Sequence, residues 1–192
     1  MKITDVKIEK FSIELTEPLK VAFAEVAHSV SLLIKVETDE GICGYGEAAP
    51  FAPVTGETAD GCAEVLGMFR TGLIGMNPLE IEKIHQMMDG VVHGNGSAKC
   101  AVDIALYDIM GKVMEQPLYR VLGGWQSVVQ NDVTIGIGDP EKMAQAAGRY
   151  VHEQGYRILK IKAGIDPAED IRALTLIRQA VGPNVRLRVD AN

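Results

Sequence analysis

The feature that most constrains the fold is an alternation of strand and helix patterns in the last third of the sequence. Apolar runs typical of buried strands lie at 131–137, 156–163 and 185–190, and helical patterns separate them at 140–153 and 167–181. This alternation is typical of a parallel sheet whose crossover helices cover it. Asp139 and Asp166 each stand directly before a proline. Aspartate is a preferred N-cap residue and proline a preferred first helical residue, so each pair predicts the start of a helix. The last third therefore predicts the first strands of a parallel α/β domain.

Residues 1–123 are organised differently. Alternating apolar residues predict strands at 3–15, 30–37 and 42–48, with Pro18 ending the first strand and a loop at 19–29 leading to the second. Helical spacing predicts one helix at 58–74, another that begins at Pro78 and a third that begins at Ser97, and Pro117 ends the last. Gly44 and Gly46 leave room for the close approach of another backbone or a ligand. We expect an α+β domain at 1–123, an antiparallel sheet plus helices, and a second domain at 124–192.

Three parallel strands are too few for a complete domain of this kind. A closed barrel needs eight strands and about 250 residues. An open parallel sheet needs both of its edges covered. We therefore interpret 124–192 as the front part of a larger unit, either a closed barrel or an open sheet. An unfinished sheet also exposes an edge, so we expect a homo-oligomer or a complementing C-terminal half as partner.

Composition excludes several function classes. The net charge is −7 and no basic run is present, which argues against nucleic acid as a partner. No apolar run approaches the roughly 20 residues of a membrane span, and Met1 leads into a strand pattern instead of a signal peptide, so we expect a cytoplasmic protein with a small-molecule substrate. Cys43, Cys62 and Cys100 are odd in number and far apart, which predicts buried apolar thiols and neither disulfides nor zinc.

The candidate site begins with two lysines in the run RILKIKAG at 157–164. Side chains alternate along a strand, so Lys160 and Lys162 share one face. An isolated pair of this kind is more often found on a solvated edge strand, where lysines deter pairing with other chains. Functional residues of parallel barrels, however, collect at the carboxyl ends of the strands. There we find Thr134 on the first strand, both lysines on the second, and Asp190 with Asn192 on the third.

Each of these residues also has a structural explanation, since Thr134 is a good strand former and Asp190 could belong to a turn or a helix cap. Their convergence on one rim favours a site. A carboxylate at a strand end can hold Mg²⁺, and a lysine held near another cation has a lowered pKa and can act as a general base. Together these groups suit abstraction of a proton next to a carboxylate, with the metal stabilising the enediolate.

Several short motifs, taken in order, carry a resemblance to a known family. They are GYGEA at 44–48 with Pro50, AKCAVDIALYDIMG at 98–111, residues 117–124, KIK at 160–162 and VDAN at 189–192. The ordered set resembles the enolase superfamily, and within it the muconate lactonizing enzyme subgroup, over the full length of the sequence. Thr55-Gly56-Glu57 and the run NDVTIGI at 131–137 are most similar to the dipeptide epimerases, the L-Ala-D/L-Glu epimerase family.

The resemblance implies an α+β N-terminal capping domain followed by the N-terminal part of a (β/α) TIM-type barrel, a (β/α)7β-type barrel truncated after the third barrel strand. It also implies a role for each rim residue. Lys162 corresponds to the general base, and Lys160 to its electrostatic partner, which also meets the substrate carboxylate. Asp190 corresponds to the first of three Mg²⁺ ligands. The other two ligands and a second catalytic lysine are expected beyond residue 192, so the truncated chain alone is expected to be inactive.

The reaction expected from the resemblance is epimerisation of a dipeptide. The alternatives are o-succinylbenzoate synthase, N-acylamino acid racemase or muconate cycloisomerase activity and, in a different class, a non-catalytic fragment or interaction module. Thr134, Phe23, Glu25 and Asn192 are the expected substrate-binding residues. Between Lys20 and Val30 the only basic residue is His28, so we expect hydrophobic or cationic second residues to be preferred and Ala-Glu substrates to be poor.

Overall fold

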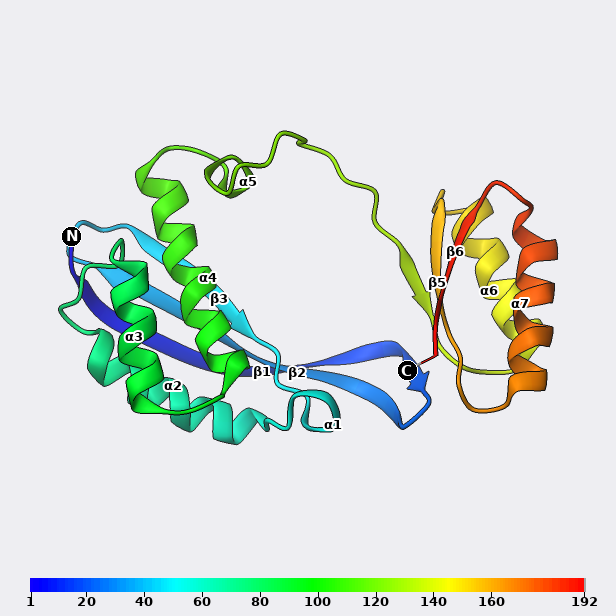
Figure 1. Ribbon diagram of the computed structural model, residues 1–192, viewed down its shortest axis with the longest axis horizontal. Helices are drawn as coiled ribbons and strands as arrows, with labels where there is room; N and C mark the ends of the chain where they lie inside the picture. Colours follow the sequence, from blue (N-terminus) through cyan, green and yellow to red (C-terminus); the bar gives the residue numbers. More distant parts are fainter. Residues whose placement is uncertain (192) are drawn as a thin grey trace. The chain divides into compact units, whose positions relative to one another are not determined.

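The computed structural model describes residues 1–191, which divide into two compact units. Unit 1 comprises residues 1–13 and 30–127, and unit 2 comprises residues 14–29 and those from 128 onward. The first two strands, β1 (Ile3–Val21) and β2 (Ala24–Thr38), form a long hairpin whose base belongs to unit 1 and whose tip belongs to unit 2 (Figure 1). The domain boundary between residues 123 and 124 stays a prediction.

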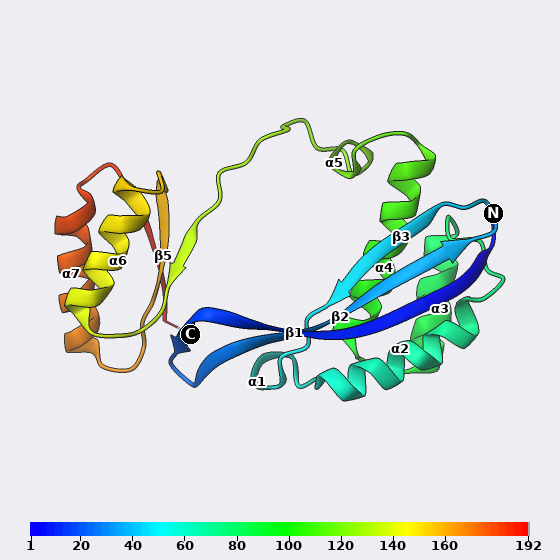
Figure 2. The same ribbon diagram turned by 180° about the vertical axis from the view of Figure 1, so that it is seen from behind.

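Unit 1 is a three-stranded sheet with helices on one face. The strand order is β1-β2-β3, and β3 (Cys43–Ala48) pairs antiparallel with β2. Figure 2 shows the sheet in front of the helices when the chain is seen from behind. The helices are α1 (Ala52–Thr55), α2 (Ala59–Leu73), α3 (Ile81–Val91), α4 (Gly96–Val113) and α5 (Leu118–Val121).

The contact between β3 and α4 is unusually close because of two glycines. A Cβ atom on Gly44 would collide with the carbonyl oxygen of Ala105, and one on Gly46 with that of Ala101. Both alanines are fully buried. The close approach predicted for these glycines is therefore confirmed, and the partner is the backbone of α4. Around this contact lies an apolar core that includes Ile3, Leu32, Ile34, Leu66, Phe69, Ile84, Met88, Leu106 and Ile109.

Unit 2 contains the predicted parallel sheet, ordered β4-β5-β6, in which both neighbouring pairs are parallel. Its elements are β4 (Val133–Ile135), α6 (Pro140–His152), β5 (Ile158–Lys162), α7 (Pro167–Val181) and β6 (Arg186–Asp190). Both helices pack on the same face of the sheet (Figure 1). The predicted N-caps are confirmed, since Asp139 accepts a hydrogen bond from the Lys142 amide and Asp166 from the Ala168 amide. The fold class is thus confirmed, with an α+β unit followed by the first strands and helices of a barrel-type sheet.

The predicted loop at 19–29 is wrong. β1 continues through Pro18 to Val21, a two-residue turn follows at Ala22 and Phe23, and β2 begins at Ala24. Proline lacks the amide hydrogen that a central strand must donate, but an edge strand tolerates it, and β1 is at the edge of its sheet. Pro18 therefore does not end the strand.

Two further expectations for unit 1 are corrected. Pro78 does not begin a helix, because α3 begins at Ile81 after a turn in which the Asn77 side chain accepts a hydrogen bond from the Leu79 amide. Cys100 is exposed on α4, whereas Cys62 is buried, and burial raises the pKa of the Cys62 thiol to about 11. Within residues 1–191, no helix has both the length and the apolar character required to cross a bilayer.

Candidate active site

The two lysines of β5 project from the sheet face that α6 and α7 leave open, called the open face below. Leu159 and Ile161 alternate with them and are buried in the core beneath the helices. The exposed fraction of the side chain is 37% for Lys160 and 16% for Lys162. Because β5 is the middle strand of β4-β5-β6, the alternative of a solvated edge strand is wrong.

Asp190 brings the two lysines together. Asp190 of β6 is the Cα partner of Lys162, and the Nζ atoms of Lys160 and Lys162 each lie 2.9 Å from Asp190 Oδ2. A carboxylate oxygen shared between two ammonium groups offsets their mutual repulsion and holds both at a defined position. We call these three residues the rim cluster.

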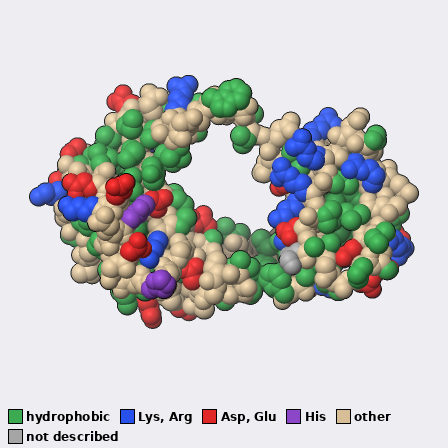
Figure 3. Space-filling view, viewed as in Figure 1, with side chains coloured by type: hydrophobic (Ala, Val, Ile, Leu, Met, Phe, Trp, Pro, Cys, Tyr) green, Lys and Arg blue, Asp and Glu red, His purple; other side chains and the backbone are tan. Residues whose placement is uncertain are grey.

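Thr134 and Arg188 belong to the adjacent row of the open face. The strand register pairs Thr134 with Lys160, and Lys160 with Arg188. Nη1 of Arg188 lies 2.9 Å from Oδ2 of Asp132, the second residue before Thr134. Lys and Arg side chains gather over the strands of unit 2 in Figure 3. Arg188 is not among the residues predicted from the sequence. It stands two residues before Asp190 on one strand, which is the same spacing that places Lys160 and Lys162 on one face.

The other predicted substrate-binding residues lie elsewhere. Phe23 is 54% exposed in the turn of the hairpin, and Glu25 is exposed near the start of β2. Within unit 2, the tip is joined to the segment after β4 by a hydrogen bond of 2.8 Å from the Ile137 amide to the Lys20 carbonyl oxygen. In the described part of the chain, no ion pair joins Glu25 to the rim cluster. Asn192 lies outside the described residues.

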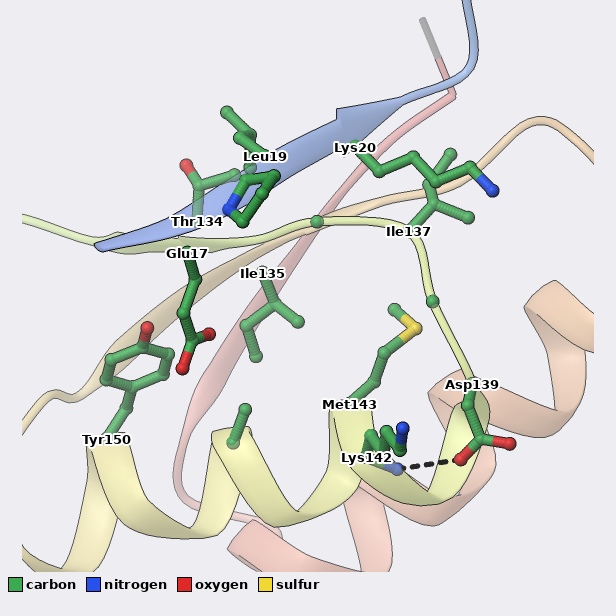
Figure 4. Close-up of a pocket in the computed structure, with 14 residues that line it drawn as sticks. Glu17, Leu19, Lys20, Thr134, Ile135, Ile137, Asp139, Lys142, Met143 and Tyr150 are labelled. Atoms are coloured by element: carbon green, nitrogen blue, oxygen red, sulfur yellow. Dashed lines mark hydrogen bonds between the residues drawn. The ribbon is translucent and has the colours of Figure 1, made fainter. Parts of the chain in front are cut away.

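A pocket of about 420 Å³ lies between the hairpin tip, β4 and α6. In Figure 4, Ile135 points from β4 toward α6 and Met143, whereas Thr134 points to the other side of the strand. Glu17 and Tyr150 line one end of the pocket. Thr134 also lines the pocket, but Lys160, Lys162 and Asp190 do not, so the pocket does not coincide with the rim cluster.

The donor chemistry of the rim cluster fits a single ligand to a hard cation. The Asp190 carboxylate offers the oxygen donors that Mg²⁺ prefers, and Mg²⁺ sites commonly use only one or two carboxylates. Among residues 1–191, no group of three His, Cys, Asp or Glu side chains is placed to hold a metal ion. The described residues can therefore supply one ligand of a magnesium site.

Comparison with known proteins defines the family. Residues 3–123 match the model of the mandelate racemase/muconate lactonizing enzyme N-terminal domain, and residues 142–192 match the enolase C-terminal domain-like model. The chain belongs to the mandelate racemase and muconate lactonizing enzyme family of the enolase superfamily.

Similar proteins with curated activities are isomerases. The chain is 42% identical to a hydrophobic dipeptide epimerase of Enterococcus faecalis, over 100% of this chain and 54% of the relative. It is 39% identical to an N-succinyl-L-Arg/Lys racemase of Bacillus cereus, over 100% of this chain and 52% of the relative. The crystal structure of the Enterococcus faecalis V583 dipeptide epimerase, complexed with Mg and the dipeptide L-Leu-L-Tyr, gives a TM-score of 0.97 over 100% of this chain and 54% of that chain. The chain thus spans about half the length of these relatives.

Proposed function

We propose that this chain carries the capping domain and the first barrel strands of a Mg²⁺-dependent dipeptide epimerase. The observation that carries the proposal is the rim cluster, in which Lys160 and Lys162 share one oxygen of Asp190 on the open face of a parallel sheet. Proton abstraction next to a carboxylate needs a base, a cation for the substrate carboxylate and a metal ligand. The cluster contains one group suited to each task.

The proposed roles follow from the position of each side chain. Lys162 is the more buried lysine and lies on the register row of Asp190. We therefore assign to its Nζ the role of base, in which the neutral amine accepts the proton from the substrate α-carbon and becomes an ammonium group. Lys160 is more exposed and lies one row away, which suits contact with the substrate carboxylate. Asp190 is the proposed metal ligand. When bound, Mg²⁺ supplies positive charge where the substrate carboxylate gains negative charge.

Substrate preference is proposed from the hairpin tip and its charges. Phe23 offers exposed apolar surface and Glu25 a negative charge, so a hydrophobic or cationic second residue is favoured over an acidic one. The similarity to relatives described as acting on hydrophobic dipeptides and on N-succinyl-L-Arg/Lys supports this preference. Thr134 and Asn192 complete the proposed substrate-binding set.

The test is exchange of the substrate α-proton with solvent deuterium. The whole protein is incubated with Mg²⁺ and either L-Leu-L-Tyr or L-Ala-L-Glu, and exchange is followed by proton NMR. We expect exchange with L-Leu-L-Tyr and slower exchange with L-Ala-L-Glu. If L-Ala-L-Glu is the better substrate, the assignment of the hairpin tip is wrong. If neither dipeptide exchanges, dipeptide epimerisation is wrong.

Racemisation of N-succinylamino acids is the second candidate, favoured by the 39% identity to the Bacillus cereus enzyme. The same assay with N-succinyl-L-arginine separates the two functions, since a racemase exchanges this substrate faster than any dipeptide. A homo-oligomer or a complementing C-terminal half, and a cytoplasmic location, stay predictions.

A further inference from the structure

A second ion pair lies next to the rim cluster. Nη1 of Arg188 in β6 lies 2.9 Å from Oδ2 of Asp132, the residue directly before β4. Because β5 lies between β4 and β6, this pair spans the middle strand of the sheet. None of the roles proposed above uses either residue.

Ile158, the first residue of β5, lies one row from Lys160 and Arg188. Ile158 alternates with Lys160 and Lys162 and therefore projects from the same open face. It is only 4% exposed, although it does not belong to the apolar cluster beneath the helices. Ile158 therefore adds an apolar side chain to the open face, next to the row that contains Arg188.

Arg188 could instead contact the rim cluster directly. It stands two residues before Asp190 on the same strand, so both side chains project from the same face. Unit 1 shows that this spacing permits an ion pair, because Lys35 and Glu37 on β2 are also two residues apart and their side chains lie 2.8 Å apart. In the structure the Arg188 guanidinium is directed to Asp132.

We propose that Asp132 is a positioning residue, which holds the Arg188 guanidinium away from Asp190 and so keeps that carboxylate accessible to Lys160, Lys162 and a metal ion. Without the Asp132 charge, the guanidinium turns toward Asp190, because carboxylates are strong acceptors for arginine. It then competes with the lysines and with a bound cation for the same oxygens. The part of this inference that concerns metal binding rests on the proposed function, whereas the position of Arg188 does not.

Two substitutions break the same ion pair with opposite expected consequences. In the whole protein, Asp132→Asn frees the guanidinium and should weaken Mg²⁺ binding about tenfold. A loss of this size is typical when a residue that positions a metal ligand, without touching the metal, is replaced. Arg188→Met removes the guanidinium and should leave Mg²⁺ affinity near that of the unsubstituted protein.

The double variant should recover most of the affinity lost in Asp132→Asn, and Asp132→Glu, which keeps the charge, should lose little. Isothermal titration calorimetry with MgCl₂ measures all four, and thermal unfolding without metal confirms that each is folded.

A merely structural ion pair gives a different result, because both single variants would then lose stability equally and show the same Mg²⁺ affinity. That outcome overturns the inference. A metal-free crystal structure of Asp132→Asn supplies the second readout. An Arg188 nitrogen within hydrogen-bond distance of Asp190 supports the inference, and a guanidinium that stays away from Asp190 overturns it. If the unsubstituted protein neither binds Mg²⁺ nor exchanges dipeptide protons, the proposed function fails, and this crystal structure still decides the position of Arg188.

Discussion

Units 1 and 2 contain the same small arrangement of charges on sheet faces that their helices leave uncovered. In unit 1, Glu37 Oε1 lies 2.8 Å from the Nζ atoms of both Lys7 and Lys35. In unit 2, Asp190 Oδ2 lies 2.9 Å from the Nζ atoms of both Lys160 and Lys162. The two carboxyl side chains are similarly accessible, with exposed fractions of 27% for Glu37 and 30% for Asp190.

The difference between the two clusters lies in the sheets that carry them. Glu37 is near the end of a strand in an antiparallel sheet, where neighbouring strands end at opposite edges. Asp190 is the last residue of β6 and pairs with Lys162, the last residue of β5, so parallel pairing brings two strand ends to one edge. Functional residues of parallel barrels collect at such an edge, where several strand ends and the loops after them meet. Two lysines and one carboxylate therefore form a surface ion-pair cluster in unit 1, whereas the equivalent arrangement in unit 2 is a candidate catalytic site.

Substitutions in the two clusters should differ most in their effect on the reaction rate. Lys162→Met should lower the rate of α-proton exchange by about 10² to 10⁴-fold, the usual contribution of a general base. Lys35→Met is the matched control, because it also removes one lysine of a lysine–carboxylate–lysine cluster, and it should leave the rate unchanged. Both rates are measured by proton NMR in deuterated buffer with the whole protein. A Lys162→Met variant that exchanges as fast as Lys35→Met would contradict the assignment of the base.

A smaller difference is expected in metal binding. Asp190→Asn removes the charge of the proposed ligand and should weaken Mg²⁺ binding by at least about tenfold, since even groups that only support a ligand contribute that much. Glu37→Gln makes the equivalent change in unit 1 and should not alter Mg²⁺ affinity. Calorimetric titration of both variants with MgCl₂ provides the comparison. Equal affinities in the two variants would remove Asp190 from the metal site.

The sequence predicts those parts of the site that depend on local spacing. The alternation of a strand is enough to place Lys160 and Lys162 on one face, and Asp139 and Asp166 before prolines are enough to place the starts of α6 and α7. The convergence of Asp190 and the lysines on one rim follows from the rule that parallel strands end at one edge. These inferences need no knowledge of which residues pair between strands.

The missed features depend on information that local spacing does not contain. Pro18 in the sequence predicts the end of a strand, but β1 continues through it because β1 is an edge strand, and the order of strands in a sheet is not visible in the sequence. The Arg188–Asp132 pair joins residues 56 positions apart across an intervening strand, so it depends on the register of two strand pairs at once. A one-residue slip in either pairing would separate the two side chains.

The smallest expected effect concerns the stability of unit 1 in acid. Hydrogen bonds from Lys35 and then Lys7 lower the pKa of Glu37 from 4.5 to about 2. Because the folded-state pKa lies below the unfolded one, the stabilisation by this carboxylate is fully present above pH 4.5 and is lost as the pH falls from 4.5 toward 2. Glu37→Gln should therefore unfold at lower denaturant concentration than the unsubstituted protein at pH 6, and the difference should shrink as the pH falls through this interval.

Lys35→Met removes the larger cause of the pKa shift and should weaken the same pH dependence. Urea titrations at a series of pH values measure both variants, and a difference that stays constant down to pH 2 would show that the lysines do not hold Glu37 in its charged form.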